Sequence, residues 1–133
     1  MGIYKDSEQL YTVLRSLFRF VEGGDPENVK SVANSHLIIR LQLKEPEAEV
    51  TINGRKNPVT ASYGKSNLRP DLDVEFPADA FHGIMMGTLP LGKAFSSGQM
   101  KVKGPMHKSF ALQDLFHQGQ AIYPQLASEF GLH

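Results

Sequence analysis

The sequence predicts an α+β fold, in which helices pack on one face of a five-stranded, largely antiparallel sheet. Five segments alternate apolar and polar residues with the period of a strand, and apolar residues recur at helical spacing before, between and after these segments. The polar alternate positions leave the other face of the sheet to solvent. A length of 133 residues suits one hydrophobic core, so we predict a single domain over residues 1–133.

Two helices are predicted at the N-terminal end. Asp6 and Gln9 have the spacing of a capping box, and the apolar stripe that follows them ends at the Gly pair 23–24. The stripe consists of Leu10, Val13, Leu14, Leu17, Phe18 and Val21. A shorter second helix is predicted from Pro26, which suits a first helical position, to about Asn34.

Three strands are then predicted to form an antiparallel meander. Apolar residues alternate with polar ones over residues 37–43, 48–52 and 59–63. Between the second and third of these segments, Asn53 is followed by Gly54, which is a strong hairpin signal.

A fourth and a fifth strand are predicted on either side of a helix. The fourth, over residues 71–76, has an acidic face, and the fifth carries Lys101 and Lys103, which could lie opposite these acids in an antiparallel pair. Pro77 begins the helix between them, and Gly87 ends it.

The C-terminal part predicts one helix from Gly104 to about Gly119 and a second that restarts at Pro124. In the first of these helices, Met106 and Phe110 lie nearly opposite the other apolar residues, so they need a cover besides the sheet. The last helix offers such a cover in the apolar stripe of Ile122, Leu126 and Phe130.

Composition excludes several classes of function. Fourteen Lys plus Arg balance fourteen Asp plus Glu with no long run of one sign, so we expect no nucleic-acid partner. The absence of Cys excludes disulfides and thiolate metal sites, and no two His have the spacing of a helical metal pair. No apolar run is long enough to span a membrane and the N-terminus lacks a signal peptide's apolar segment, so we expect a cytoplasmic protein.

No catalytic residue or cofactor is predicted either. Gly-rich phosphate motifs are absent, and the serines lack a nucleophile context. Tyr63 with Asp71 or Asp73 could imitate the hydroxyl and carboxyl pair of a steroid isomerase, but the acids lie on the predicted solvated face. His82 is open to two interpretations, a solvent-facing side chain or a hydrogen-bond partner for the polar head of a ligand.

The stretch from Asp71 to Phe116 resembles the signature region of the sterol carrier protein type 2 family. The resemblance lies in an ordered set: the helix around Phe81, then Gly87 with Leu89, Ala94 with Phe95, Ser97 with Gly98, a strand, and Lys103 with Gly104. The chain departs from the family pattern at Pro77, at Pro90 with Leu91, and in having no Trp. A cone-shaped α+β fold such as that of nuclear transport factor is the main alternative, but the helices after the last strand argue against it.

The resemblance implies an apolar cavity or tunnel between sheet and helices that binds, and could transfer, a fatty acyl chain, a sterol or a related lipid without catalysis. Four of the five Met lie in this region, and flexible thioethers suit ligands of variable shape. The residues implied as lining are Phe81, Ile84, Met85, Leu89, Phe95, Met100, Met106 and Phe110. By the same analogy, the segment from Ile122 to Phe130 would be a mobile cover, and transient membrane contact would accompany lipid exchange. An alternative is an interaction module, accessory to an enzyme of lipid or quinone metabolism, that forms a homodimer through the C-terminal helix.

Overall fold

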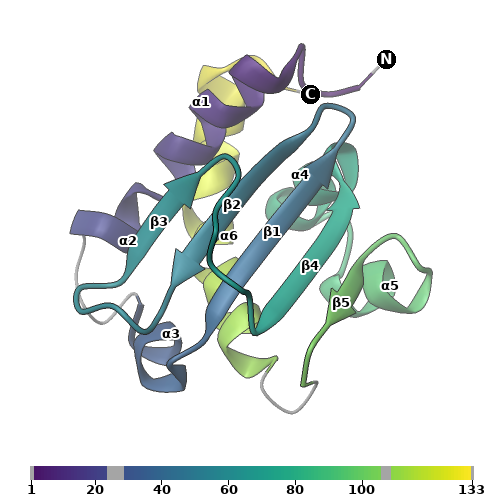
Figure 1. Ribbon diagram of the computed structural model, residues 1–133. Coiled ribbons are helices and arrows are strands. Elements are labelled where there is room, and N and C mark those ends of the chain that lie inside the picture. The colour runs from purple at the N-terminus through teal and green to yellow at the C-terminus, as the bar shows by residue number, and fades with distance from the viewer. Residues whose placement is uncertain (1, 24–28, 106–108, 133) are drawn as a thin grey trace.

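The computed structural model describes residues 2–23, 29–105 and 109–132. Within these ranges it contains six helices and five strands (Figure 1). In chain order they are α1 (Ser7–Leu17), α2 (Arg19–Gly23), α3 (Lys30–Ser35), β1 (Ile38–Lys44), β2 (Ala48–Asn53), β3 (Thr60–Tyr63), β4 (Leu72–Pro77), α4 (Ala78–Met86), α5 (Leu91–Ser96), β5 (Lys101–Lys103) and α6 (Phe110–Glu129).

The five strands form one sheet in the order β3-β2-β1-β4-β5. All neighbouring pairs are antiparallel except β1 and β4, which run parallel, so the predicted five-stranded, largely antiparallel sheet is confirmed. The predicted charge pairing is confirmed as well, because Asp73 lies opposite Lys103 and Glu75 lies opposite Lys101.

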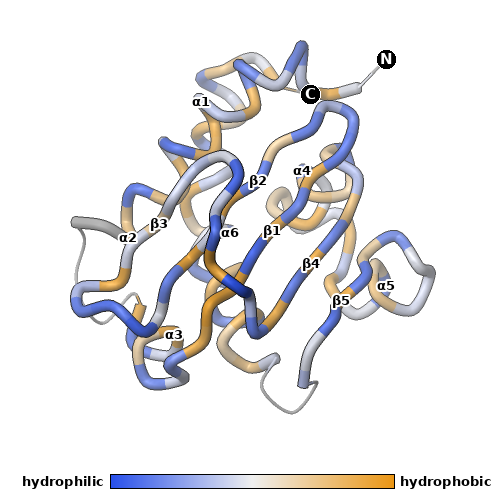
Figure 2. Tube along the Cα trace, viewed as in Figure 1, coloured by the Kyte–Doolittle hydropathy of each residue, from blue (hydrophilic) through white to orange (hydrophobic). Residues whose placement is uncertain are grey.

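The helices cover one face of the sheet. In Figure 1, α1, α4 and α6 lie behind the strands, whereas the connection from β3 to β4 crosses in front of them. Figure 2 shows apolar and polar residues alternating along the central strands, as expected when the two faces have different surroundings. On the front face, which we call the open face, the Arg40 Nε donates to Asp73 Oδ1 at 3.1 Å and the Gln42 amide donates to the same oxygen at 2.7 Å.

An aromatic cluster occupies the core between β4, α4 and α6. The Phe76 and Phe81 rings meet edge to face with centroids 5.5 Å apart, and Phe116 and Tyr123 pack against them. All four side chains are fully buried. A Cβ added at Gly119 of α6 would lie 3.1 Å from the Met85 sulfur. The missing side chain at Gly119 therefore lets Met85 of α4 pack close to the backbone of α6.

The N-terminal helices follow the predicted pattern with one difference. Gln9 N donates to the Asp6 side chain at 2.8 Å, and the Gln9 amide oxygen accepts from Lys5 N at 2.6 Å. These two reciprocal hydrogen bonds cap the N-terminus of α1. The single predicted helix is divided, because α1 ends at Leu17 and α2 starts at Arg19. The start predicted at Pro26 lies outside the described residues, and α3 ends at Ser35.

The C-terminal part differs from the prediction in two respects. The six-residue helix α5 occupies the stretch between Gly87 and the fifth strand, where no helix was predicted, and α6 is one continuous helix with Pro124 inside it. Because α6 runs on, residues 122–130 lie about 18–30 Å along its axis from Phe110 and cannot cover that side chain. Phe110 is accordingly 70 % exposed, so the predicted cover of Phe110 by the Ile122 to Phe130 segment is wrong, and Met106 lies outside the described residues.

Candidate functional site

A half-open apolar pocket lies at the edge of the sheet, between α5, β5 and the first turns of α6. Its volume is about 280 Å³. Hydrophobic side chains form most of its wall, and a serine hydroxyl and a glutamine amide are its polar side-chain groups. The lining residues are Leu91, Gly92, Phe95, Met100, Val102, Ser109, Leu112 and Gln113.

Local structure explains how these side chains come together. Met100 N donates to Ala94 O at 2.9 Å, and this bond folds the chain after α5 back toward β5. Val102 pairs with Val74 of β4, so Met100 and Val102 share the face of the sheet that the helices cover. Leu112 of α6, buried to 2 % exposure, closes the pocket on the other side.

The structure divides the eight predicted lining residues into groups. Phe95 and Met100 line the pocket together. Phe81, Ile84 and Met85 are buried in the core. Met106 lies outside the described residues.

Two predicted residues lie elsewhere. Leu89 turns back onto α4, where its backbone N donates to Gly83 O at 3.0 Å, and it is partly buried there. Phe110 lines a separate depression of about 450 Å³ with Ser31, Asn34, Ser35 and Ala111.

The other pocket residues have weaker signals in the sequence. Leu91 and Val102 were visible as apolar positions, and Leu112 was part of the predicted apolar side of the last helices. Ser109 and Gln113 had no sequence signal, because a polar residue near the start of a helix is usually solvated. Only the packing of α6 against α5 and β5 shows that they border a pocket.

A buried polar network joins α4 to α6 and to the N-terminal segment. The Tyr123 hydroxyl is 2.6 Å from the Tyr4 hydroxyl and 2.6 Å from His82 Nδ1. His82 is buried, so the interpretation of a solvent-facing side chain is wrong. It does not line the apolar pocket either, and its Nδ1 is engaged by Tyr123. Burial lowers the pKa of His82, although Asp79 acts in the opposite direction.

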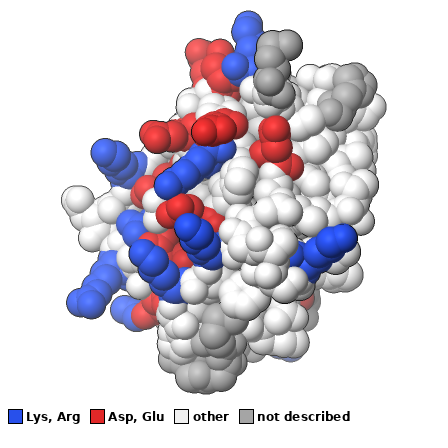
Figure 3. All heavy atoms as spheres, turned by 90° about the vertical axis from the view of Figure 1, so that its right-hand side faces the viewer, with Lys and Arg blue, Asp and Glu red and all other residues white. Residues whose placement is uncertain are grey.

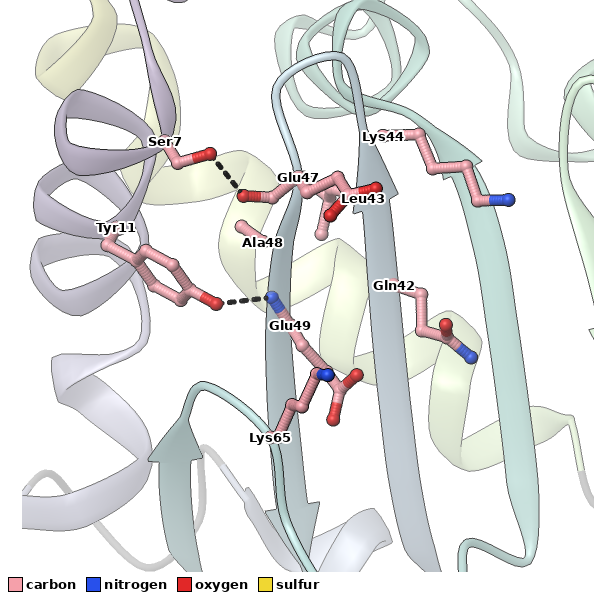
Figure 4. A pocket seen from close by; sticks show the side chains of 9 residues that line it. All are labelled: Ser7, Tyr11, Gln42, Leu43, Lys44, Glu47, Ala48, Glu49 and Lys65. Atoms are coloured by element: carbon pink, nitrogen blue, oxygen red, sulfur yellow. Dashed lines mark hydrogen bonds between the residues drawn. The ribbon is translucent and has the colours of Figure 1, made fainter.

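A larger, more polar pocket lies between α1 and the β1–β2 hairpin (Figure 4). Its volume is about 400 Å³. The Ser7 hydroxyl donates to Glu47 O at 2.6 Å and the Tyr11 hydroxyl accepts from Glu49 N at 3.0 Å, so these side chains satisfy backbone groups of the hairpin. Its charges have both signs, and the apolar pocket at α5 is the better candidate for a lipid.

Charged side chains concentrate on the open face. Figure 3 shows them gathered toward the side of the open face, and few on the rest of that view. Lys44 pairs with Glu75 at 2.9 Å, and Arg40 pairs with Asp73. Burial would raise the pKa of Asp73, but hydrogen bonds from Arg40 and Gln42 outweigh it and the pKa is lowered.

Neither a metal-binding cluster nor a membrane-spanning helix is present among the described residues. No group of His, Asp and Glu side chains there could hold a metal ion. In the same residues, no helix is both long and apolar enough to cross a membrane.

Solved structures with a similar fold come from several organisms. The sterol carrier protein domain 2 of Helicoverpa armigera has a TM-score of 0.64 at 18% identity, covering 82% of this chain and 89% of that one. The apo form of sterol carrier protein 2 from Yarrowia lipolytica has a TM-score of 0.62 at 19% identity, covering 90% and 98%. The palmitated sterol carrier protein 2 like 2 of Aedes aegypti has a TM-score of 0.59 at 18% identity, covering 81% and 94%.

No curated protein sequence matches the chain significantly. The sequence model of the SCP-2 sterol transfer family, by contrast, matches residues 18–117, which include the whole sheet and the pocket-lining residues. The chain therefore belongs to the SCP-2 sterol transfer family.

Proposed function

We propose that this protein binds the hydrocarbon part of an apolar lipid, such as a fatty acyl chain, a sterol or a related molecule, in the pocket between α5, β5 and α6, and passes it to other carriers or membranes. The observation that carries this proposal is the apolar wall formed by Phe95, Met100 and Leu112 at an opening to solvent. Membership of a lipid-binding family and the fold shared with a palmitated relative support it.

The energetics suit a reversible carrier. A lipid segment that removes on the order of 200 Å² of apolar surface from water gains roughly 5 kcal/mol before association costs. Such contacts are non-directional and select apolar bulk. We therefore expect weak, exchangeable binding and not a permanently bound molecule.

We further propose that the protein acts without catalysis. The acids that could have served an isomerase are engaged in structural interactions. Asp71 accepts from Arg55 Nη2 at 2.8 Å and from Ile38 N at 2.8 Å, and Asp73 is held by Arg40 and Gln42.

A pocket-filling variant tests the binding site. A Cβ added at Gly92 meets no atom within 4 Å, so Gly92→Phe places a ring at the pocket wall without a backbone clash. We expect its affinity for an acyl lipid, measured by titration calorimetry, to fall by roughly tenfold or more, equivalent to about 1.4 kcal/mol.

Ser96→Phe is the matched control, because Ser96 is exposed on the same helix and does not line the pocket. We expect it to bind lipid as the unaltered protein does. Equal affinity in both variants, or no extractable and no titratable lipid in the unaltered protein, would contradict the proposed site.

A further inference from the structure

The segment of residues 86–96, which we call the α5 segment, exposes apolar side chains at one edge of the molecule (Figure 1). Two of the four large apolar side chains that are exposed among the described residues belong to it, Phe95 at 44 % and Met86 at 37 %. Leu91, one turn before Phe95 on α5, is partly buried. Leu91 and Phe95 also line the apolar pocket, so an apolar surface continues from the pocket to solvent.

The sequence around the α5 segment is free of acidic residues. Residues 80–113 contain four Lys and no Asp or Glu, although the whole chain has equal numbers of acidic and basic residues. Lys93 of α5 is exposed between Leu91 and Phe95 in the chain. Figure 3 looks onto this side of the molecule, where a wide area carries few charged side chains. Exposed apolar side chains beside a cation suit the surface of an anionic membrane.

The two lysines of β5 add positive charge at the same edge of the sheet. They are exposed and lie opposite Glu75 and Asp73 of β4. These acids also pair with Lys44, at 2.9 Å, and with Arg40, so each acid is shared between two cations. This cluster of four cations and two acids therefore carries a net positive charge.

The size of the exposed apolar surface favours a membrane over a protein partner. The exposed parts of these few side chains amount to at most a few hundred Å², which is common on monomers. A stable protein interface buries roughly 800 Å² on each partner. A membrane surface requires less area, because a few inserted apolar side chains and nearby lysines contribute without a matching protein surface.

We propose that the α5 segment docks on the surface of a bilayer that contains anionic phospholipids, with Phe95 inserted beside the opening of the pocket. A lipid then moves between bilayer and pocket with little of its hydrocarbon exposed to water. This inference rests on the proposed function, because it names the face through which the same lipid enters.

Vesicle co-sedimentation tests the docking. We expect binding to vesicles of phosphatidylcholine with phosphatidylglycerol, weaker binding to phosphatidylcholine alone, and release as the salt concentration rises. Lys93→Gln should weaken binding to the anionic vesicles roughly fivefold. Lys56→Gln is the control, because Lys56 is exposed in the turn after β2 and its loss makes the same change in net charge away from α5.

A second pair of variants tests the apolar contact. Phe95→Ala should weaken binding to the anionic vesicles several-fold, because the exposed ring supplies the apolar area that enters the bilayer. Leu68→Ala is the control, since Leu68 is 39 % exposed in the connection from β3 to β4, which crosses the open face. We expect Leu68→Ala to bind vesicles as the unaltered protein does.

The outcomes separate docking from binding in the pocket. Lys93 and Phe95 variants that bind vesicles as well as their controls, or equal binding to neutral and anionic vesicles, would overturn the docking. A concentration-dependent dimer in sedimentation velocity that Phe95→Ala abolishes would assign the α5 segment to a second copy of the chain and overturn it as well.

Calorimetric titration with decanol, without vesicles, tests the pocket by itself. Lys93 does not line the pocket, so Lys93→Gln should bind decanol as the unaltered protein does. If decanol binds but the vesicle results fail, the docking falls and the proposed function stands. If the vesicle results hold but decanol does not bind, the proposed function falls and the membrane contact alone remains.

Discussion

The hydroxyl of Tyr123 joins three segments of the chain. It contacts Tyr4 in the N-terminal segment and His82 in α4, both at 2.6 Å, and all three side chains are buried. The Tyr123 ring also packs edge to face against Phe81 in the aromatic cluster. The N-terminal segment is thus attached to the region where α4 packs against α6.

Loss of this one oxygen should destabilise the fold. Tyr123→Phe keeps the ring but leaves the Tyr4 hydroxyl and His82 Nδ1 without their shared partner, so we expect a loss of about 1–3 kcal/mol in the free energy of unfolding. Urea denaturation measures it. Tyr11→Phe is the control, because that half-buried hydroxyl accepts a single bond, from Glu49 N, at the rim of the polar pocket. An equal loss in both variants would contradict the importance of the buried network.

His82 should make stability depend on pH. Burial holds the pKa of His82 in the folded protein below its ordinary value, so protons bind the unfolded chain more readily. The contribution of His82 is therefore complete above about pH 6.5 and decreases as the pH falls through the lowered pKa. Burial also raises the pKa of Tyr123 to about 12 and raises that of Tyr4, so neither phenol ionises in this window.

Denaturation at a series of pH values checks this dependence. We expect His82→Asn, which retains a polar group near the Nδ1 position, to be less stable near neutral pH but to lose less stability on acidification than the unaltered protein. A difference between the two proteins that does not change with pH would show that His82 does not titrate in this range.

At the scale of elements, the short strand β5 depends on the glycine that follows it. Gly104 has a φ of 132°, and a Cβ there would lie 2.2 Å from the carbonyl oxygen of Asp71. The backbone after β5 thus passes directly over the start of β4. This close approach sets where β5 ends, and β5 contributes Val102 to the apolar pocket.

Gly104→Ala should be strongly destabilising because it combines an unfavourable φ with a backbone clash. We expect a loss of about 2–4 kcal/mol in the free energy of unfolding, measured by urea denaturation. Gly92→Ala in α5 is the control, since its Cβ has open space, and a gain of up to about 1 kcal/mol is expected from helix propensity. Similar stability of the two variants would mean that the chain relaxes around position 104 at little cost.

At the scale of the whole molecule, the proposed pocket lies beside the aromatic core and not inside it. Phe76, Phe81, Phe116 and Tyr123 fill the space between the middle of the sheet and the helices. The pocket instead occupies the edge where α5 and β5 extend from the sheet (Figure 1). Access to this pocket from solvent therefore does not require the core to open.

The C-terminal helix α6 packs against the core of the molecule through part of its apolar stripe. Tyr123 and Ala127 are buried within the molecule, and Ile122, Leu126 and Phe130 pack in part against the same core. The apolar stripe is thus used in part inside the fold, and the mobile cover and the homodimer contact stay predictions. Pro124 does not restart the helix, because this buried stripe continues across it.

The sequence alone determined the local elements with strong periodicity. The alternation in β1, β2 and β4, the capping of α1 by Asp6, and the end of α4 at Gly87 follow from short-range sterics and hydrogen bonding. The pairing of Lys101 and Lys103 with Glu75 and Asp73 was predicted in the same way, because the prediction uses only opposite charges and the alternation of strand residues. Helix α5 was missed because six residues that include Gly92 carry too little periodicity to be distinguished from a turn.

Tertiary structure decided which apolar residues meet one another. Phe81 and Phe95 look equivalent in the sequence, yet Phe81 is fully buried in the core and Phe95 is 44 % exposed at the pocket. The difference arises from contacts between segments far apart in the chain, such as the parallel pairing of β1 with β4 and the packing of α6 beside α5. Periodicity reports that a side chain is apolar and on which side of its element it lies, but burial depends on what the rest of the fold places against that side.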